Sequence, residues 1–88
     1  MKLNEGWILA EIQNEYMAVP VGANADEFAG VVRLNESGRD IWDGLAKGLD
    51  EQAIARMMVQ KYAGLRTEKA LEGIRRVTDM LRTEGLLQ

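Results

Sequence analysis

One short segment, VVRLNESGRDIW at residues 31–42, constrains the fold more than any other part of the sequence. An apolar, β-prone run ends at Leu34. Asn35 follows directly and has the side chain of a helix N-cap, and Glu36 falls in the first turn, where a negative charge favours the helix. Because almost no loop separates the two elements, we expect this junction to fix a strand against a helical layer.

Two further strands are expected before the junction. WILAEIQ (Trp7–Gln13) alternates in polarity, and EYMAVPVG (Glu15–Gly22) follows after Asn14, which predicts a hairpin with Asn14 at or near the turn. GANADE (Gly22–Glu27) has the composition of a loop. FAGVVRL (Phe28–Leu34) is then predicted to form the third strand.

Three helices are expected after the junction. Their predicted spans are Glu36–Lys47, Glu51–Tyr62 and Glu68–Glu84, capped by Asn35, Asp50 and Thr67 and followed by Gly48, Gly64 and Gly85. A three-stranded antiparallel sheet exposes a face that three amphipathic helices can cover. The sequence therefore predicts an α+β fold in a single domain over residues 1–88.

Composition argues against several classes of function. The chain lacks His and Cys, which removes the commonest general base, thiol chemistry and the commonest metal ligands. We therefore expect no catalysis, cofactor or metal site. The net charge of −3 disfavours a nucleic-acid partner. No apolar run is long enough to span a membrane, and no signal peptide is visible, so a cytoplasmic location is expected.

The third predicted helix has two different stripes of residues. At about 100° per residue, four apolar positions fall together and should face the core: Ala70, Ile74, Val77 and Leu81. A mixed stripe lies on the shoulder of the first: Leu71, Arg75, Thr78 and Arg82. Arg76 lies farther round, in a solvated i,i+4 pair with Glu72.

This shoulder stripe has two interpretations. In the first, Arg75 and Arg82 lay their aliphatic stems over the edge of the core. In the second, the stripe is the wall of a groove for an acidic partner, because a guanidinium can bind a carboxylate through two hydrogen bonds. The two arginines lie about 10 Å apart along the helix, so the second interpretation predicts a partner with acidic residues at a matching spacing.

Several segments, taken in order, resemble the PqqD family, the small protein of pyrroloquinoline quinone synthesis and its relatives. They are EYMAVPVG, FAGVVRLNESGRDIWDGL, DEQAIARMMVQKYAG and LRTEGLL, and together they span nearly the whole chain. The most specific part is the pattern Leu34-Asn35-x-x-Gly38-x-x-Ile41-Trp42 at the strand–helix junction. The later helices match by pattern alone.

This resemblance implies a winged-helix-like RiPP recognition element. Such a module binds the leader of a ribosomally made, post-translationally modified peptide and delivers it to a modifying enzyme, often a radical SAM protein. The leader would add as a strand beside the third strand and against the third helix. The implied peptide-binding residues are Phe28, Ala29, Gly30, Val31, Val32, Arg33, Leu34, Leu71, Arg75, Thr78 and Arg82. Asn35 and Gly38 are expected to be architectural, and quinone synthesis is not distinguished from other peptide pathways.

Two other functions remain open. A homodimerisation module would pair the same edge strands of two copies. A winged-helix DNA-binding protein is less favoured, because Glu68, Glu72, Asp79 and Glu84 interleave the basic residues of the third helix.

Overall fold

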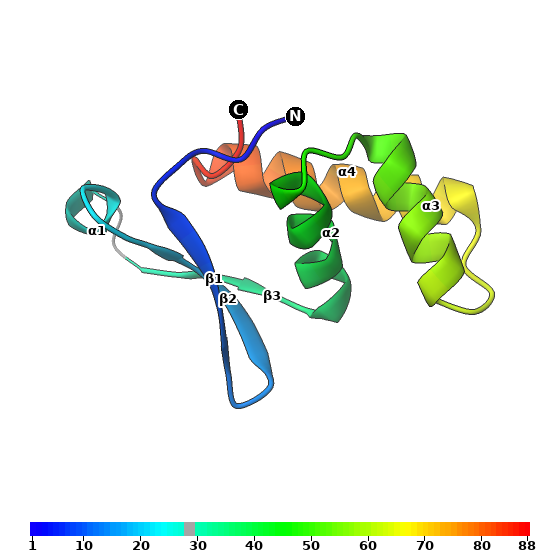
Figure 1. Ribbon diagram of the computed structural model, residues 1–88, viewed down its shortest axis with the longest axis horizontal. Helices are drawn as coiled ribbons and strands as arrows, with labels where there is room; N and C mark the ends of the chain where they lie inside the picture. Colours follow the sequence, from blue (N-terminus) through cyan, green and yellow to red (C-terminus); the bar gives the residue numbers. More distant parts are fainter. Residues whose placement is uncertain (28–29) are drawn as a thin grey trace.

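The computed structural model describes residues 1–27 and 30–88, with the element order β1, β2, α1, β3, α2, α3, α4 (Figure 1). Its three strands form one antiparallel sheet in the order β1-β2-β3, so β1 and β3 are the two edges. The predicted α+β fold, a three-stranded sheet followed by helices, is confirmed. One element was not predicted: α1 (Asn24–Glu27) is a single helical turn within the segment expected to be a loop.

The predicted hairpin is formed by β1 (Trp7–Ile12) and β2 (Glu15–Pro20). Gln13 and Asn14 connect the strands with φ angles of 52° and 66°. Two successive residues with positive φ angles are typical of a type I′ turn, whose twist matches the twist of the two strands that it connects. Both strands end one or two residues earlier than the sequence indicated.

The third strand, β3, is shorter than predicted and covers only Val32–Leu34. It pairs antiparallel with β2, with Leu34 opposite Tyr16 and Val32 opposite Ala18. Gly30 precedes it with a φ of 127°, a backbone conformation that residues with a Cβ rarely adopt. The chain therefore bends before β3, which limits the strand to three residues.

The three long helices are α2 (Glu36–Ala46), α3 (Glu51–Lys61) and α4 (Thr67–Thr83). Asn35 caps α2 by accepting a hydrogen bond from the Gly38 amide at 2.8 Å, as predicted. Asp50 caps α3 in the same way, through the Ala53 amide at 2.8 Å. The predicted cap at Thr67 is wrong, because α4 begins at that residue and Arg66 occupies the N-cap position without a side-chain hydrogen bond.

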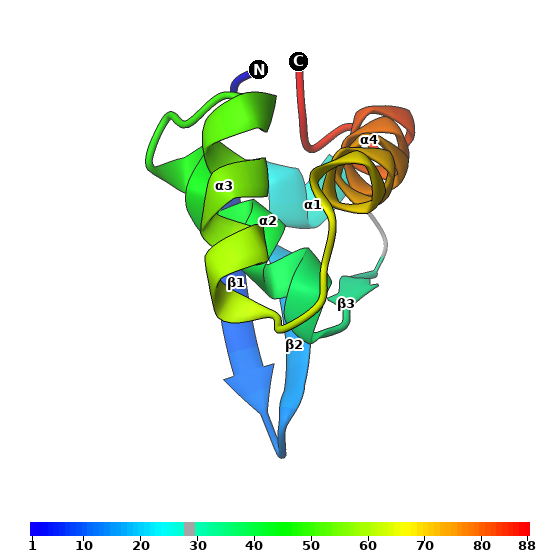
Figure 2. The same cartoon turned by 90° about the vertical axis from the view of Figure 1, so that its right-hand side faces the viewer.

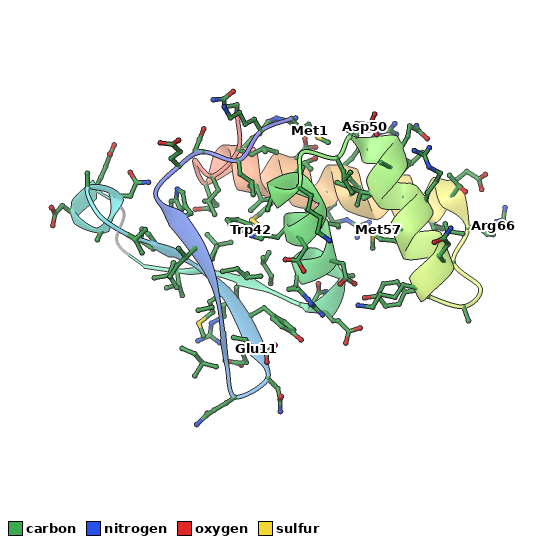
Figure 3. The ribbon with its side chains drawn as sticks, in the orientation of Figure 1. Met1, Glu11, Trp42, Asp50, Met57 and Arg66 are labelled. Carbon is green, nitrogen blue, oxygen red and sulfur yellow. The ribbon has the colours of Figure 1, made fainter. Side chains whose placement is uncertain are left out.

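The core lies between the helices and one face of the sheet. Ile41, Ile54, Ile74 and Leu81 are almost completely buried, and burying a side chain of this size contributes about 1.5–3 kcal/mol. Trp42, labelled in Figure 3, lies on the side of α2 that faces the sheet and is also buried.

The two ends of the chain lie side by side (Figure 1). Leu3 forms an antiparallel bridge with Leu87, and the Asn4 amide donates to the Leu86 carbonyl at 2.8 Å. These contacts bury Leu86 and Leu87 and tie the segment after α4 to the strand side of the molecule. None of the described helices is long and apolar enough to cross a membrane.

Candidate peptide-binding groove

The outer edge of β3 is the first part of the candidate site. β2 pairs with one side of β3, and no other strand of the described residues pairs with its opposite side. Backbone N–H and C=O groups along such an edge remain available to a further strand. Leu34 points into the core, whereas Arg33 points away from it and is exposed. The buried Leu34 side chain thus anchors β3 to the core, while the backbone groups on the outer side of β3 have no strand partner among the described residues.

A hollow of ≈ 290 Å³ lies directly beside this edge, between β3 and α4. In Figure 2, α4 is seen nearly end-on with β3 close to it. The hollow is lined by Arg33, Leu34, Asn35, Gly38, Arg76, Val77 and Met80. Asn35 and Gly38, which were expected to be only architectural, therefore also form part of its surface.

A second hollow, of ≈ 550 Å³, continues along α4 towards its N-terminus. It shares Asn35, Arg76 and Val77 with the first hollow, so the two hollows adjoin, and together they are called the groove below. Gly73 of α4 and Tyr62 lie in its wall, and the surface of this wall is mostly apolar. This arrangement offers backbone pairing at β3 and side-chain pockets farther along, which are the two requirements for recognising an extended peptide.

Three cationic side chains border the groove: Arg33, Lys69 and Arg76. The Glu72 carboxylate lies 3.5 Å from both Lys69 and Arg76, and Arg33 lies 3.8 Å from Glu15. All five side chains are more than half exposed. Exposed pairs of this kind contribute about 0–1 kcal/mol each. A carboxylate on a bound peptide can therefore compete for these cations.

The predicted shoulder stripe lies on the other side of α4. Thr78 is buried and donates its hydroxyl to the Arg75 carbonyl at 3.1 Å, so it is part of the core. The Arg75 guanidinium faces α3, 3.4 Å from Glu51. Arg82 donates to the Gln88 carbonyl at 3.0 Å, and Leu71 packs against the core. The expectation that these residues face β3 is therefore wrong, because α4 turns its opposite shoulder towards the strand.

The predicted edge residues are only partly brought together. Val32, Arg33 and Leu34 form β3, whereas Gly30 and Val31 are exposed and precede it. Phe28 and Ala29 lie outside the residues that the structure describes.

A polar cluster behind the groove was not predicted. The buried carboxylate of Asp40 on α2 accepts hydrogen bonds from Lys61 at 2.9 and 3.1 Å and from the Tyr62 hydroxyl. Desolvation is the largest cause of a raised pKa of the Tyr62 hydroxyl, and the hydrogen bond to Asp40 is the next. A tyrosine hydroxyl is neutral near pH 7 even at its ordinary pKa, so Tyr62 can donate to Asp40. The cluster joins α2 to the end of α3 and holds Tyr62 in the groove wall.

Among the groove residues that the sequence analysis missed, four lie on one stripe of α4: Gly73, Arg76, Val77 and Met80. They recur at i, i+3, i+4 and i+7, so they form a second shoulder of the same helix. The unusual glycine within this stripe is the signal that could have indicated a groove. Among the described residues, no group of acidic side chains is arranged to hold a metal ion.

Comparison with known proteins agrees with this fold. A family model described as coenzyme PQQ synthesis protein D (PqqD) matches residues 24–87. The fold is similar to that of a solved structure described as TbiB1 in complex with the TbiA(beta) leader peptide. The TM-score is 0.80, with 19% sequence identity over 100% of this chain and 95% of that chain. No curated protein matches the sequence. Because the family match includes β3, α2, α3 and α4, this chain belongs to the PqqD family.

Proposed function

We propose that this protein is a non-catalytic, winged-helix-type module that binds the leader of a ribosomally made precursor peptide. The leader adds as a strand to the outer edge of β3, and its side chains enter the groove along α4. The observation that carries the proposal is that the hollow beside the free edge of β3 adjoins the hollow along α4, with Asn35, Arg76 and Val77 lining both. Membership of the PqqD family and the leader peptide bound to the structurally similar TbiB1 support it.

The edge of β3 and the hollows along α4 have different roles in recognition. Backbone hydrogen bonds to β3 supply affinity with little dependence on sequence, and the pockets along α4 fix the register. Because Arg33, Lys69 and Arg76 border the path, the preferred leader carries acidic residues. The bound leader is presented to a peptide-modifying enzyme, such as a radical SAM protein, in the cytoplasm, where precursor peptides are made. The final product is pyrroloquinoline quinone or another modified peptide.

Calorimetry with a synthetic leader tests this proposal. The leader is taken from the precursor encoded beside the gene of this protein, and a scrambled peptide of the same composition is the control. We expect saturable 1:1 binding by the leader, with a dissociation constant on the order of 1 µM, and none by the scrambled peptide. A leader with proline at a residue that pairs with β3 should bind much more weakly, because proline removes a backbone N–H.

The proposal fails if the native leader does not bind at high micromolar concentration, either alone or with the modifying enzyme present. It also fails if proline substitutions throughout the leader leave the affinity unchanged, because strand addition requires backbone donors. If two copies instead pair through β3, the protein is a homodimer that the leader dissociates.

A further inference from the structure

The other edge of the sheet, β1, lacks the features that usually protect an edge strand. It runs for six residues, pairs with β2 without a bulge and contains no proline. Glu11, labelled in Figure 3, is its only charged residue. Edge strands are normally blunted by charges, prolines, bulges or a covering element, because their unpaired backbone groups attract other strands. In Figures 1 and 2 the hairpin projects away from the long helices, which leaves the β1 edge accessible.

The side chains of β1 that point away from the core are apolar. Leu9 packs against the core, so strand alternation turns Ile8, Ala10 and Ile12 to the opposite face of the sheet. Ile8 and Ile12 remain 52% and 56% exposed, which is unusual for side chains of this size. They are placed symmetrically about Ala10, two residues to either side.

We propose that two copies of this chain pair through their β1 edges, antiparallel about a two-fold axis at Ala10, to form a six-stranded sheet. In this register Ile8 of one copy lies opposite Ile12 of the other, so the exposed isoleucines cover each other. Glu11 lies opposite Leu9, which keeps the two Glu11 carboxylates from facing one another directly. This self-complementarity identifies a second copy, rather than an unrelated strand, as the occupant of the edge.

The size of the contact sets its strength. A six-residue strand is about 20 Å long, and its contact is far smaller than the roughly 800 Å² per partner of a standard interface. The dimer should therefore be weak and reversible, with a dissociation constant on the order of 100 µM. Because β3 is the opposite edge, the dimer leaves both leader grooves free, and the proposal does not depend on leader binding.

Cysteine cross-linking tests the register, since the natural chain contains no Cys. Directly opposed residues in an antiparallel pair have Cα atoms about 4.5–5.5 Å apart, within the range that a disulfide spans. With oxidised glutathione as the oxidant, Ala10→Cys should form a covalent dimer at least tenfold faster than Ile8→Cys. A difference in exposure would give the opposite order, because Ile8 is exposed and Ala10 is partly buried. Equal rates would overturn the proposed register.

Sedimentation velocity tests the dimer itself, up to about 1 mM protein, roughly ten times the expected dissociation constant. Ile12→Lys should keep the protein monomeric throughout this range. Val31→Lys is the matched control, because Val31 is 45% exposed but lies beside β3, and this variant should still dimerise. The proposal is overturned if the natural chain stays monomeric at the highest concentration. It is also overturned if Val31→Lys abolishes the dimer while Ile12→Lys leaves it intact.

Discussion

Two adjacent arginines of α4, Arg75 and Arg76, point in different directions, and only one of them borders the proposed peptide groove. Arg75 and Arg76 are neighbours in the chain, but successive helical residues point about 100° apart. Arg75 faces α3 and Glu51, whereas Arg76 borders both hollows of the groove. The sequence-based interpretation gave these residues the opposite roles, with Arg75 in the groove and Arg76 in solvent.

Charge reversal at these two positions provides a matched comparison. Arg76→Glu should weaken binding of an acidic leader by about threefold to tenfold, because it replaces an attraction of about 0.2–1 kcal/mol with a repulsion. The effect should shrink at high salt, where exposed charges are screened. Arg75→Glu changes the net charge equally but lies outside the groove, and it should alter the affinity less than about twofold. Calorimetry at two salt concentrations measures both variants. Equal losses would mean that only net charge matters.

At the scale of elements, Gly73 lowers the stability of α4, and contacts within the chain do not explain why a glycine is present there. A glycine in a helix interior is about 1 kcal/mol less favourable than alanine. A Cβ built at Gly73 meets no atom within 4 Å, so packing against the rest of the chain does not require a glycine there. Gly73 lies in the wall of the larger hollow, and in the proposed complex the missing side chain would leave space there for the peptide.

Substitutions at Gly73 should therefore separate stability from binding. Gly73→Ala should raise the free energy of unfolding by about 0.5–1 kcal/mol and should leave leader binding within about threefold, because one methyl group fills little of the hollow. Gly73→Phe should fold normally but weaken leader binding at least tenfold, because its ring fills the groove. Chemical denaturation and calorimetry provide the two measurements. Unchanged binding by Gly73→Phe would show that the leader does not pass this point.

Interactions between residues close in sequence were enough to predict most of the helices and strands, but they did not show which side of α4 faces β3. The caps at Asn35 and Asp50 and the turn at Asn14 depend on residues close in sequence, so the sequence was sufficient. A helix with a central apolar stripe has two shoulders, and only tertiary packing decides which one meets a strand. Thr78 was also assigned to the wrong side of α4. It was expected in the groove because it is polar, but its hydroxyl donates to a carbonyl within α4, so the residue can be buried in the core.

Two other features depended on distant contacts. The carboxylate of Asp40 is buried because Lys61 and Tyr62, about twenty residues later, supply its hydrogen bonds. The predicted third strand extended back to Phe28, but the bend at Gly30 confines β3 to the three residues that meet Tyr16–Ala18 of β2.

At the scale of the whole molecule, the two sheet edges face different surroundings. The edge of β3 carries Arg33 and opens onto α4, where Lys69 and Arg76 border the groove, whereas the charged residues of the β1–β2 hairpin are Glu11 and Glu15. If the leader is acidic, as proposed, this charge distribution should draw it towards β3 and α4 and away from the hairpin. Strand addition at β3 is the central claim that follows from this arrangement.

Nuclear magnetic resonance of isotope-labelled protein with unlabelled leader tests that claim most directly. Strand addition predicts the largest amide shifts at Val32–Leu34 and at Arg76, Val77 and Met80. It also predicts backbone proton contacts between the leader and β3 in an antiparallel or parallel ladder pattern. Shifts confined to the Arg75 and Arg82 side of α4, or contacts of the leader with β1 instead of β3, would contradict the account.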